Sequence, residues 1–467
     1  MSVDKQEQSK NFFKTWAHTI IGMATGAGEK HKDLLPLGVT DVQVTISRST
    51  EKEIGVKNQN VVSSESGMSQ GVSITLYSGQ KKLNFYLNSL NSDSLKKAIE
   101  ENVIALSYVP EDEFAGLLPK EDVFKGADKD FDVVDATSVS DEKLIRFAKE
   151  MEQGAKTVNS YKNSRTIAIS SSEYESMTIA TNGVERFRSG TNFTAMITPI
   201  AEKPLKNSND VERQVDYDYT STVHFDDLEN PMAIGIRAVK AAEAKLGSTQ
   251  PDSEELTVIL SQSAASGFFG NAISAMDGNA VYKGATFLKD KLGKQIFADN
   301  ITILDDPHVQ KSTASMTRDS AGLEVKPLKL VDNGILKLFN INLEEGRKLG
   351  MDPIGRQNGL TNVSVTGGQR SVDDLIADVE KGIYVLGFNG GTIKIDDGSY
   401  SREAYGFMIE DGKVREDKPV SGFTVAGNLE NMMLAAEIAN DTPTLPNRKT
   451  NLAAPTTRIN KLKIGGK

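Results

Sequence analysis

Few residues of this 467-residue sequence have side chains suited to nucleophilic, acid–base or metal chemistry. The chain contains no cysteine, and its four histidines are widely separated: His18, His31, His224 and His308. The absence of cysteine excludes thiolate nucleophiles, disulfides and the zinc sites that contain cysteine. The spacing of the histidines excludes an H-E-x-x-H helix, which places two imidazoles on one face. Most common catalytic centres are therefore excluded.

Two glycine motifs are similar to functional loops but lie in the wrong context. Gly67–Gly71 (GMSQG) matches G-x-S-x-G, which in hydrolases places a serine nucleophile between a strand and a helix. A strand follows here, so we expect only a turn. Gly387–Gly391 (GFNGG) has glycines that could present N–H groups to an anion, but the lysine of a P-loop is missing. We expect a hairpin turn.

Acidic residues provide a further candidate for metal binding. Asp396 and Asp397 could gather with Glu410 and Asp411 around a hard cation. The spacing of a calcium-binding loop is absent, so exposed turn carboxylates are the preferred interpretation.

His308 closely follows Asp305 and Asp306 after a predicted strand. A surface imidazole is the simpler interpretation. A hydrolase that uses His308 with either aspartate at an unrecognised, labile metal site is kept as an alternative.

Composition limits the partners. The formal net charge of −10 argues against a nucleic-acid partner, because phosphate binding depends on clustered Lys and Arg. No run approaches the roughly 18 apolar residues that span a membrane, and no signal peptide is recognised. We therefore expect a cytoplasmic protein that contacts neither membranes nor nucleic acid directly.

The pattern of apolar residues predicts an α+β protein with three parts. Residues 10–110 and 125–246 form two similar mixed modules, each with helices and a meander of strands, joined by a solvated connector over 110–139. Residues 251–467 read as many short strands with glycine turns and two helices, at 263–276 and 371–381. This pattern indicates a β-rich, barrel-like C-terminal domain, with a partly extended tail after Asn440.

Three C-terminal stretches carry a family resemblance. They are the helical region 261–284 continued by 292–297, the segment GSYSREAYGF at 398–407, and TVAGNL at 424–429. The last two are close to G-D-Y-S-R-G-A-x-G-F and I-A-G-N-L, although Ser399 and Glu403 depart from the pattern. The chain thus resembles the TldD/PmbA family, also called modulator of DNA gyrase.

The resemblance implies a branch of the family. The TldD branch carries H-E-x-x-x-H on this helix, which binds zinc with help from a cysteine and uses the glutamate as base. Here Ser266, Gly267 and Asn271 occupy those positions, and none can replace a zinc ligand or the base. The sequence therefore looks like the PmbA/TldE branch, with no catalytic residue and no cofactor of its own.

This branch implies a non-metal-binding subunit that pairs with a TldD-like subunit in a heterodimeric zinc metalloprotease acting on unfolded peptides. Zinc is then expected in the partner. Strand edges of the C-terminal domain could hold an extended peptide through backbone hydrogen bonds. The alternative from another class is a self-associating scaffold, for example a homodimer, without a role in proteolysis.

The resemblance also suggests residues that contact substrate or partner. They are Tyr400, Ser401, Arg402, Tyr405 and Asn428. A structural role competes for two of them: Arg402 could instead form a salt bridge that organises its hairpin, and Tyr400 could belong to the core.

Overall fold

The computed structural model describes residues 3–205, 209–446 and 450–467. Its N-terminal half is one long, curved antiparallel sheet with the order β3-β2-β1-β4-β5-β6, in which β7 also pairs with β5. The strands are β1 (Asp41–Lys57), β2 (Asn60–Ser78), β3 (Lys81–Leu87), β4 (Tyr161–Ala180), β5 (Glu185–Pro204), β6 (Val211–Val215) and β7 (Asp218–Thr222). Because β1 pairs with β4, the two predicted modules share a single sheet.

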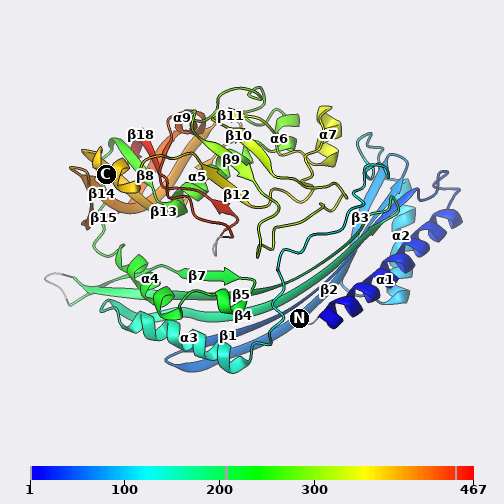
Figure 1. Ribbon diagram of the computed structural model, residues 1–467, viewed down its shortest axis with the longest axis horizontal. Coiled ribbons are helices and arrows are strands. Elements are labelled where there is room, and N and C mark those ends of the chain that lie inside the picture. Colours follow the sequence, from blue (N-terminus) through cyan, green and yellow to red (C-terminus); the bar gives the residue numbers. More distant parts are fainter. Residues whose placement is uncertain (1–2, 206–208, 447–449) are drawn as a thin grey trace.

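Four helices cover the convex face of this sheet in two pairs (Figure 1). They are α1 (Val3–Lys30) with α2 (Ser92–Ser107), and α3 (Asp141–Lys156) with α4 (Pro231–Glu243). Asn91 and Ser140 cap α2 and α3 through their side-chain oxygens. Alternate residues of β1 face the helices, so Val42 and Val44 are buried under the first pair and Ile54 under the second.

Several predicted turns lie inside continuous strands. Gly67–Gly71 belongs to β2, so the predicted turn is wrong; an added Cβ at Gly71 would lie 1.8 Å from Tyr86 Oη, which explains a glycine there. The Gly387–Gly391 hairpin turn is also wrong, because this segment runs through β13 (Lys381–Ile393) with two bulges. Asp411 and Gly412, both with positive φ, form the turn between the strands that end at Glu410 and begin at Lys413.

The connector has no helix or strand but is not a solvated linker. Leu118, Val123 and Phe131 are buried. The Phe124 N–H donates to Gly322 O at 2.9 Å, which ties the connector to a loop of the C-terminal half. Its acidic composition concealed the apolar residues that dock it between the halves.

The C-terminal half contains a closed barrel, since β18 pairs with both β8 and β15. The barrel strands are β8 (Glu254–Leu260), β13, β14 (Ser399–Glu410), β15 (Lys413–Asn428) and β18 (Thr457–Gly465), and β16 (Glu437–Ile438) joins β18. A second sheet consists of β11 (Ile335–Leu336), β10 (Leu328–Asp332), β9 (Thr302–Asp305), β12 (Val363–Thr366) and β17 (Leu452–Ala453). The predicted α+β class with a barrel-like C-terminal domain is confirmed. The tail contains β17 and β18, while its residues 447–449 lie outside the described residues.

Short helices complete this half. They are α5 (Gln262–Ser274), α6 (Gly278–Tyr282), α7 (Leu343–Leu349), α8 (Val372–Ala377) and α9 (Leu429–Leu434), and a 3-10 turn, η1 (Phe225–Asp227), precedes α4. Helix α5 supplies Phe268 and Phe269 to the core between barrel and second sheet, and Phe269 stacks on Phe297 with ring centroids 5.5 Å apart. Among the described residues, no helix is long and apolar enough to cross a membrane.

Candidate functional site

Helix α5 carries the motif positions on the face opposite its core contacts. Ser261 caps the helix by accepting a hydrogen bond from Ala264 N, and Phe268 and Phe269 are fully buried. Ser266 and Asn271 are half-buried, and Gly267 is exposed. The helix therefore presents its motif face outward while the core fixes its orientation.

The side chains on this face do not fit a zinc ion. Ser266 Oγ donates to Gln262 O at 2.8 Å, and Asn271 Nδ2 donates to Gly267 O at 2.7 Å. Both groups are thus used by the helix backbone, and Gly267 has no side chain. Across the residues that the structure describes, no three His, Cys, Asp or Glu side chains gather as metal ligands. The donor set of a zinc site is missing.

The C-terminal tail runs beside the same helix. Gln262 Nε2 donates to Asp441 O at 2.6 Å and to its Oδ2 at 3.0 Å. Leu452 O lies 3.3 Å from Ser266 Oγ and accepts from it. The tail therefore contacts the motif face at two separate points.

A cleft of about 580 Å³ lies on the outer face of the barrel, against α9. Thr392, Ser401, Ala426 and Lys463 are consecutive cross-strand neighbours on β13, β14, β15 and β18, and all four line it. The small side chains of Ser401 and Ala426 in the middle of this row leave space for the cleft, and α9 forms one wall of it.

Three of the five predicted contact residues line this cleft: Tyr400, Ser401 and Asn428. Ser401 is exposed. Asn428 caps α9 through its Oδ1, and its Nδ2 donates to Asp397 O at 2.9 Å. Tyr400 is 2% exposed, and burial raises the pKa of its hydroxyl, which has no hydrogen-bond partner among the described residues.

The other two predicted contact residues lie elsewhere. Arg402 Nε donates to Gly390 O at 2.7 Å, and the guanidinium lies 5.0 Å from the centre of the Phe388 ring. This arrangement stabilises the bulge in β13, and among the described residues Arg402 forms no salt bridge.

Tyr405 joins the two halves of the chain. Its hydroxyl lies 3.4 Å from Asp216 Oδ2, and Lys245 Nζ lies 4.1 Å from the centre of its ring. Burial, together with the nearby Asp216 carboxylate, raises the pKa of Tyr405. The side chain is therefore committed to an internal contact.

Lysines give the cleft a positive charge that the sequence motifs did not reveal. Lys394, Lys461 and Lys463 line it, and within the described ranges none of them has a carboxylate at salt-bridge distance. No acidic side chain lines the cleft, although the chain carries a net charge of −10. Lys461 and Lys463 lie two residues apart, as residues on one face of a strand do, and this spacing is the signal from which the charged cleft could have been predicted.

The structure separates Asp305 from His308 but leaves Asp306 beside it, since Asp306 Oδ1 accepts from His308 N at 2.9 Å. Asp305 and Arg356 form an ion pair in which both side chains are 0% exposed. His308 instead stacks on Phe131 at 5.9 Å between ring centroids, and its Nδ1 lies 3.4 Å from Lys129 Nζ. Burial and this lysine lower the pKa of His308. Asp305 is therefore part of a structural ion pair.

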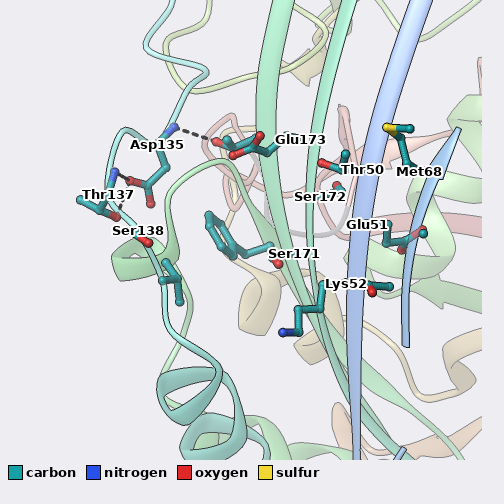
Figure 2. A pocket seen from close by; sticks show the side chains of 15 residues that line it. Thr50, Glu51, Lys52, Met68, Asp135, Thr137, Ser138, Ser171, Ser172 and Glu173 are labelled. Atoms are coloured by element: carbon teal, nitrogen blue, oxygen red, sulfur yellow. Dashed lines mark hydrogen bonds between the residues drawn. The ribbon is translucent and has the colours of Figure 1, made fainter. Parts of the chain in front are cut away.

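A second hollow, of about 590 Å³, lies on the helix-bearing face of the long sheet, where α1 and α3 leave the strands uncovered. Figure 2 shows Thr50, Met68 and Ser171 around it, with Thr137 on the connector opposite. Ser69, the serine of the G-x-S-x-G motif, shares a hydrogen bond with Ser49 at 2.8 Å. No histidine lines this hollow.

Comparison with known proteins gives the family. The PmbA/TldA metallopeptidase models match all three parts of the chain: domain 1 over residues 42–106, the central domain over 135–246 and the C-terminal domain over 253–466. The chain therefore belongs to the PmbA/TldD metallopeptidase family, as the sequence motifs indicate.

Individual relatives agree over nearly the full length. A metalloprotease PmbA homolog of Haemophilus influenzae is 27% identical, covering 91% of this chain and 92% of that protein. Metalloprotease PmbA of Escherichia coli O157:H7 gives the same identity and coverage.

Solved structures share the fold. One from Bacteroides thetaiotaomicron, described as a modulator of DNA gyrase, has a TM-score of 0.85 at 25% identity and covers 97% of this chain and 99% of that one. TldE from Thermococcus kodakarensis has a TM-score of 0.76 at 21% identity, covering 94% and 100%.

Proposed function

We propose that this chain is the PmbA/TldE-like, non-metal-binding subunit of a heterodimeric zinc metalloprotease that processes or degrades unfolded peptides. The observation that carries the proposal is the outer face of α5. Ser266, Gly267 and Asn271 occupy the positions of two metal ligands and a base, and the hydroxyl and amide present there are bound to the helix backbone. The catalytic zinc then belongs to a TldD-like partner in the cytoplasm.

The lysine-lined cleft on the barrel gives this subunit a role besides assembly. Lys394, Lys461 and Lys463 surround a floor of small side chains, which suits a carboxylate on a peptide or on the partner subunit. Ser401 and Asn428 are the predicted contact residues best placed to take part. Because the net charge is −10, the proposal includes no direct contact with DNA.

The test is to purify the chain alone and after co-expression with a TldD-type partner that contains H-E-x-x-x-H. Gel filtration, zinc analysis by mass spectrometry and cleavage of an unfolded peptide are measured on both samples. We expect one zinc ion and peptide cleavage only in the complex. Tight stoichiometric zinc with cleavage by the chain alone would contradict the proposal.

Matched variants locate the metal. Ser266→Ala and Asn271→Ala in this subunit leave the zinc content of the complex unchanged, because neither side chain is a ligand. A loss of zinc from the complex in either variant would place the metal on this chain instead.

A further inference from the structure

The long N-terminal sheet has an unpaired edge. Strand β3 pairs with β2 only over Val72–Ser78, whereas β1 pairs with β2 along its length. In the part of the chain that the structure describes, no strand pairs with the other side of β2 over residues 60–71. From Ser63 to Gly71, where the register with β1 is regular, every second residue directs its backbone N–H and C=O away from β1.

This edge has few of the features that normally protect a free strand edge: one bulge, at Val62, and one charged residue, Glu65. Residues 60–71 read NVVSSESGMSQG, without proline, lysine or arginine. Val62 and Met68 are 63% and 71% exposed. By contrast, the outer strand of the β14–β15 hairpin carries Lys413, Arg415 and Pro419 where it projects beyond the barrel. The open edge of β2 is therefore available for pairing with another extended chain.

Acidic residues line the sheet face that α1 and α3 do not cover. Glu53 and Glu65 lie directly opposite each other on β1 and β2, and Glu51 lies two residues along from Glu53. All three are exposed, and none has an ion-pair partner among the described residues. Like charges directly opposite on neighbouring strands are destabilising, so this arrangement favours a ligand that brings positive charge.

The other face of the same edge meets the hollow of Figure 2. Ser66 and Met68 of β2 line it together with Thr50 and Ser171, so side chains of an added strand that pointed to this face would extend into it. Lys52, Glu173 and Asp135 also line the hollow, but each is already engaged: Lys52 pairs with Asp141 of α3, Glu173 pairs with Lys5 of α1, and Asp135 accepts from Thr137 Oγ1 and Phe225 N. The hollow therefore suits small polar or uncharged side chains.

We infer that the free edge of β2, residues 60–71, binds an extended peptide by strand addition, with Lys or Arg at alternate positions facing Glu51, Glu53 and Glu65 and small polar residues facing the hollow. The main chain supplies the hydrogen bonds, and the two faces select alternate side chains. The inference rests on the proposed role in peptide turnover and gives that role a binding site away from the barrel cleft.

A second copy of this chain fits the edge less well. Symmetric antiparallel pairing of two such edges, centred on Glu65, would place the Glu65 residues of the two copies directly opposite each other, because directly opposite residues share a face of the sheet. The acidic rows of both copies would then be adjacent, with no positive charge to offset them. A basic peptide removes this repulsion.

The experiment uses the complex of this chain with its TldD-type partner, in which the partner's catalytic glutamate is changed to glutamine so that bound peptide survives. The probe is a fluorescein-labelled twelve-residue peptide of alternating lysine and threonine, and binding is followed by fluorescence anisotropy. Hydrogen exchange with mass spectrometry then locates the contact. We expect fast exchange over residues 60–71 in the free complex and protection of this segment when the peptide is added.

Two matched peptides separate backbone pairing from charge. N-methylation of alternate residues preserves the charge but removes N–H donors, and we expect about tenfold weaker binding or more. Replacing the lysines by glutamates should abolish measurable binding.

Matched variants test the acidic row. The double variant Glu53→Gln and Glu65→Gln should weaken binding of the lysine–threonine peptide by about threefold or more, as expected from losing two exposed ion pairs. Glu416→Gln, at an exposed glutamate on β15, should leave binding unchanged.

Three results would overturn the inference: equal binding of the N-methylated peptide, protection outside residues 60–71 only, or protection of this segment before any peptide is added. The last result would show that another protein chain occupies the edge. Cleavage by the complex with its partner's glutamate intact is assayed separately. Cleavage without edge protection would refute this site alone, whereas absence of complex or cleavage would refute the proposed function.

Discussion

The two halves of this chain differ in how their strands end at an edge. In the C-terminal half, β18 pairs with both β8 and β15 and closes the barrel, so the cleft offers side chains such as Lys461 rather than free backbone. In the N-terminal half, β2 leaves residues 60–71 without a second neighbour, so the backbone itself is exposed. The two proposed sites therefore differ in kind: the cleft would bind through side-chain charge, and the edge of β2 would bind through backbone pairing.

The largest predicted effect lies in the closed half. Phe268→Ala removes a fully buried ring between the barrel and the second sheet, and we expect the free energy of unfolding to fall by about 3–5 kcal/mol. Urea denaturation followed by circular dichroism measures it. Phe12→Ala, at a ring that is 46% exposed on α1, is the control and should cost far less. Similar losses in both variants would contradict the packing described.

The next prediction concerns the turn at Asn58 and Gln59, which joins β1 to the open-edged strand β2. The Glu152 carboxylate is completely buried and accepts from Asn58 N at 2.7 Å, from Gln59 N at 2.6 Å and from Gln59 Nε2 at 2.7 Å. We expect Glu152→Gln to lower the free energy of unfolding by about 1–3 kcal/mol at pH 7. Glu150→Gln on the same helix is the control and should have little effect.

The effect of Glu152 should depend on pH. Burial alone would raise the pKa of Glu152, but the hydrogen bonds from Gln59 and Asn58 outweigh burial and hold the pKa below its ordinary value of 4.5. A lowered pKa contributes stability above that ordinary value, and this contribution is lost as the pH falls through the folded-state pKa. The difference between wild type and Glu152→Gln should therefore shrink below pH 4.5. A difference that grows on acidification would contradict the hydrogen bonds described.

A smaller effect is expected where the halves meet. Tyr405→Phe removes the hydroxyl that lies 3.4 Å from the Asp216 carboxylate, and we expect a loss of about 0.5–1 kcal/mol. Thermal unfolding by calorimetry measures it. Tyr108→Phe, at a side chain that is 79% exposed, should leave the midpoint unchanged. Equal midpoints for both variants would show that this contact does not stabilise the junction.

The smallest effect is expected on the open edge itself. Met68 is 71% exposed, so Met68→Ala should change the free energy of unfolding by less than about 0.5 kcal/mol. Urea denaturation beside Phe268→Ala makes the contrast between the halves quantitative. A loss above 1 kcal/mol would mean that the edge of β2 is packed against something in the folded protein.

Local patterns in the sequence predicted much of the fold. Alternation at Val42, Val44 and Ile46 is typical of a strand, and Asn91 and Ser140 are residue types that favour the N-cap of a helix. Strand lengths were harder, because β4 and β5 continue through polar residues that pair with neighbours distant in sequence. The same limit applied at Gly67–Gly71, where glycine makes room for Tyr86 inside a strand.

The sequence likewise predicted one part of the candidate site and not the other. The α5 positions Ser266, Gly267 and Asn271 were identified from the motif alone, because residue type decides whether a side chain can bind zinc. Arg402 and Tyr405 lie in the same motif, but the structure places them in a bulge and at the junction between the halves. A motif shows which residues are near in sequence, whereas packing decides which of them reach a surface.

The sequence by itself determined the family, the fold class and the absence of cysteine and of paired histidines, because residue types and short spacings decide these properties. Only the tertiary structure decided that Lys394 lies in one cleft with Lys461 and Lys463, and that β3 stops short along β2. Both features depend on pairing between strands far apart in the chain. No local pattern records which backbone groups such pairing leaves free.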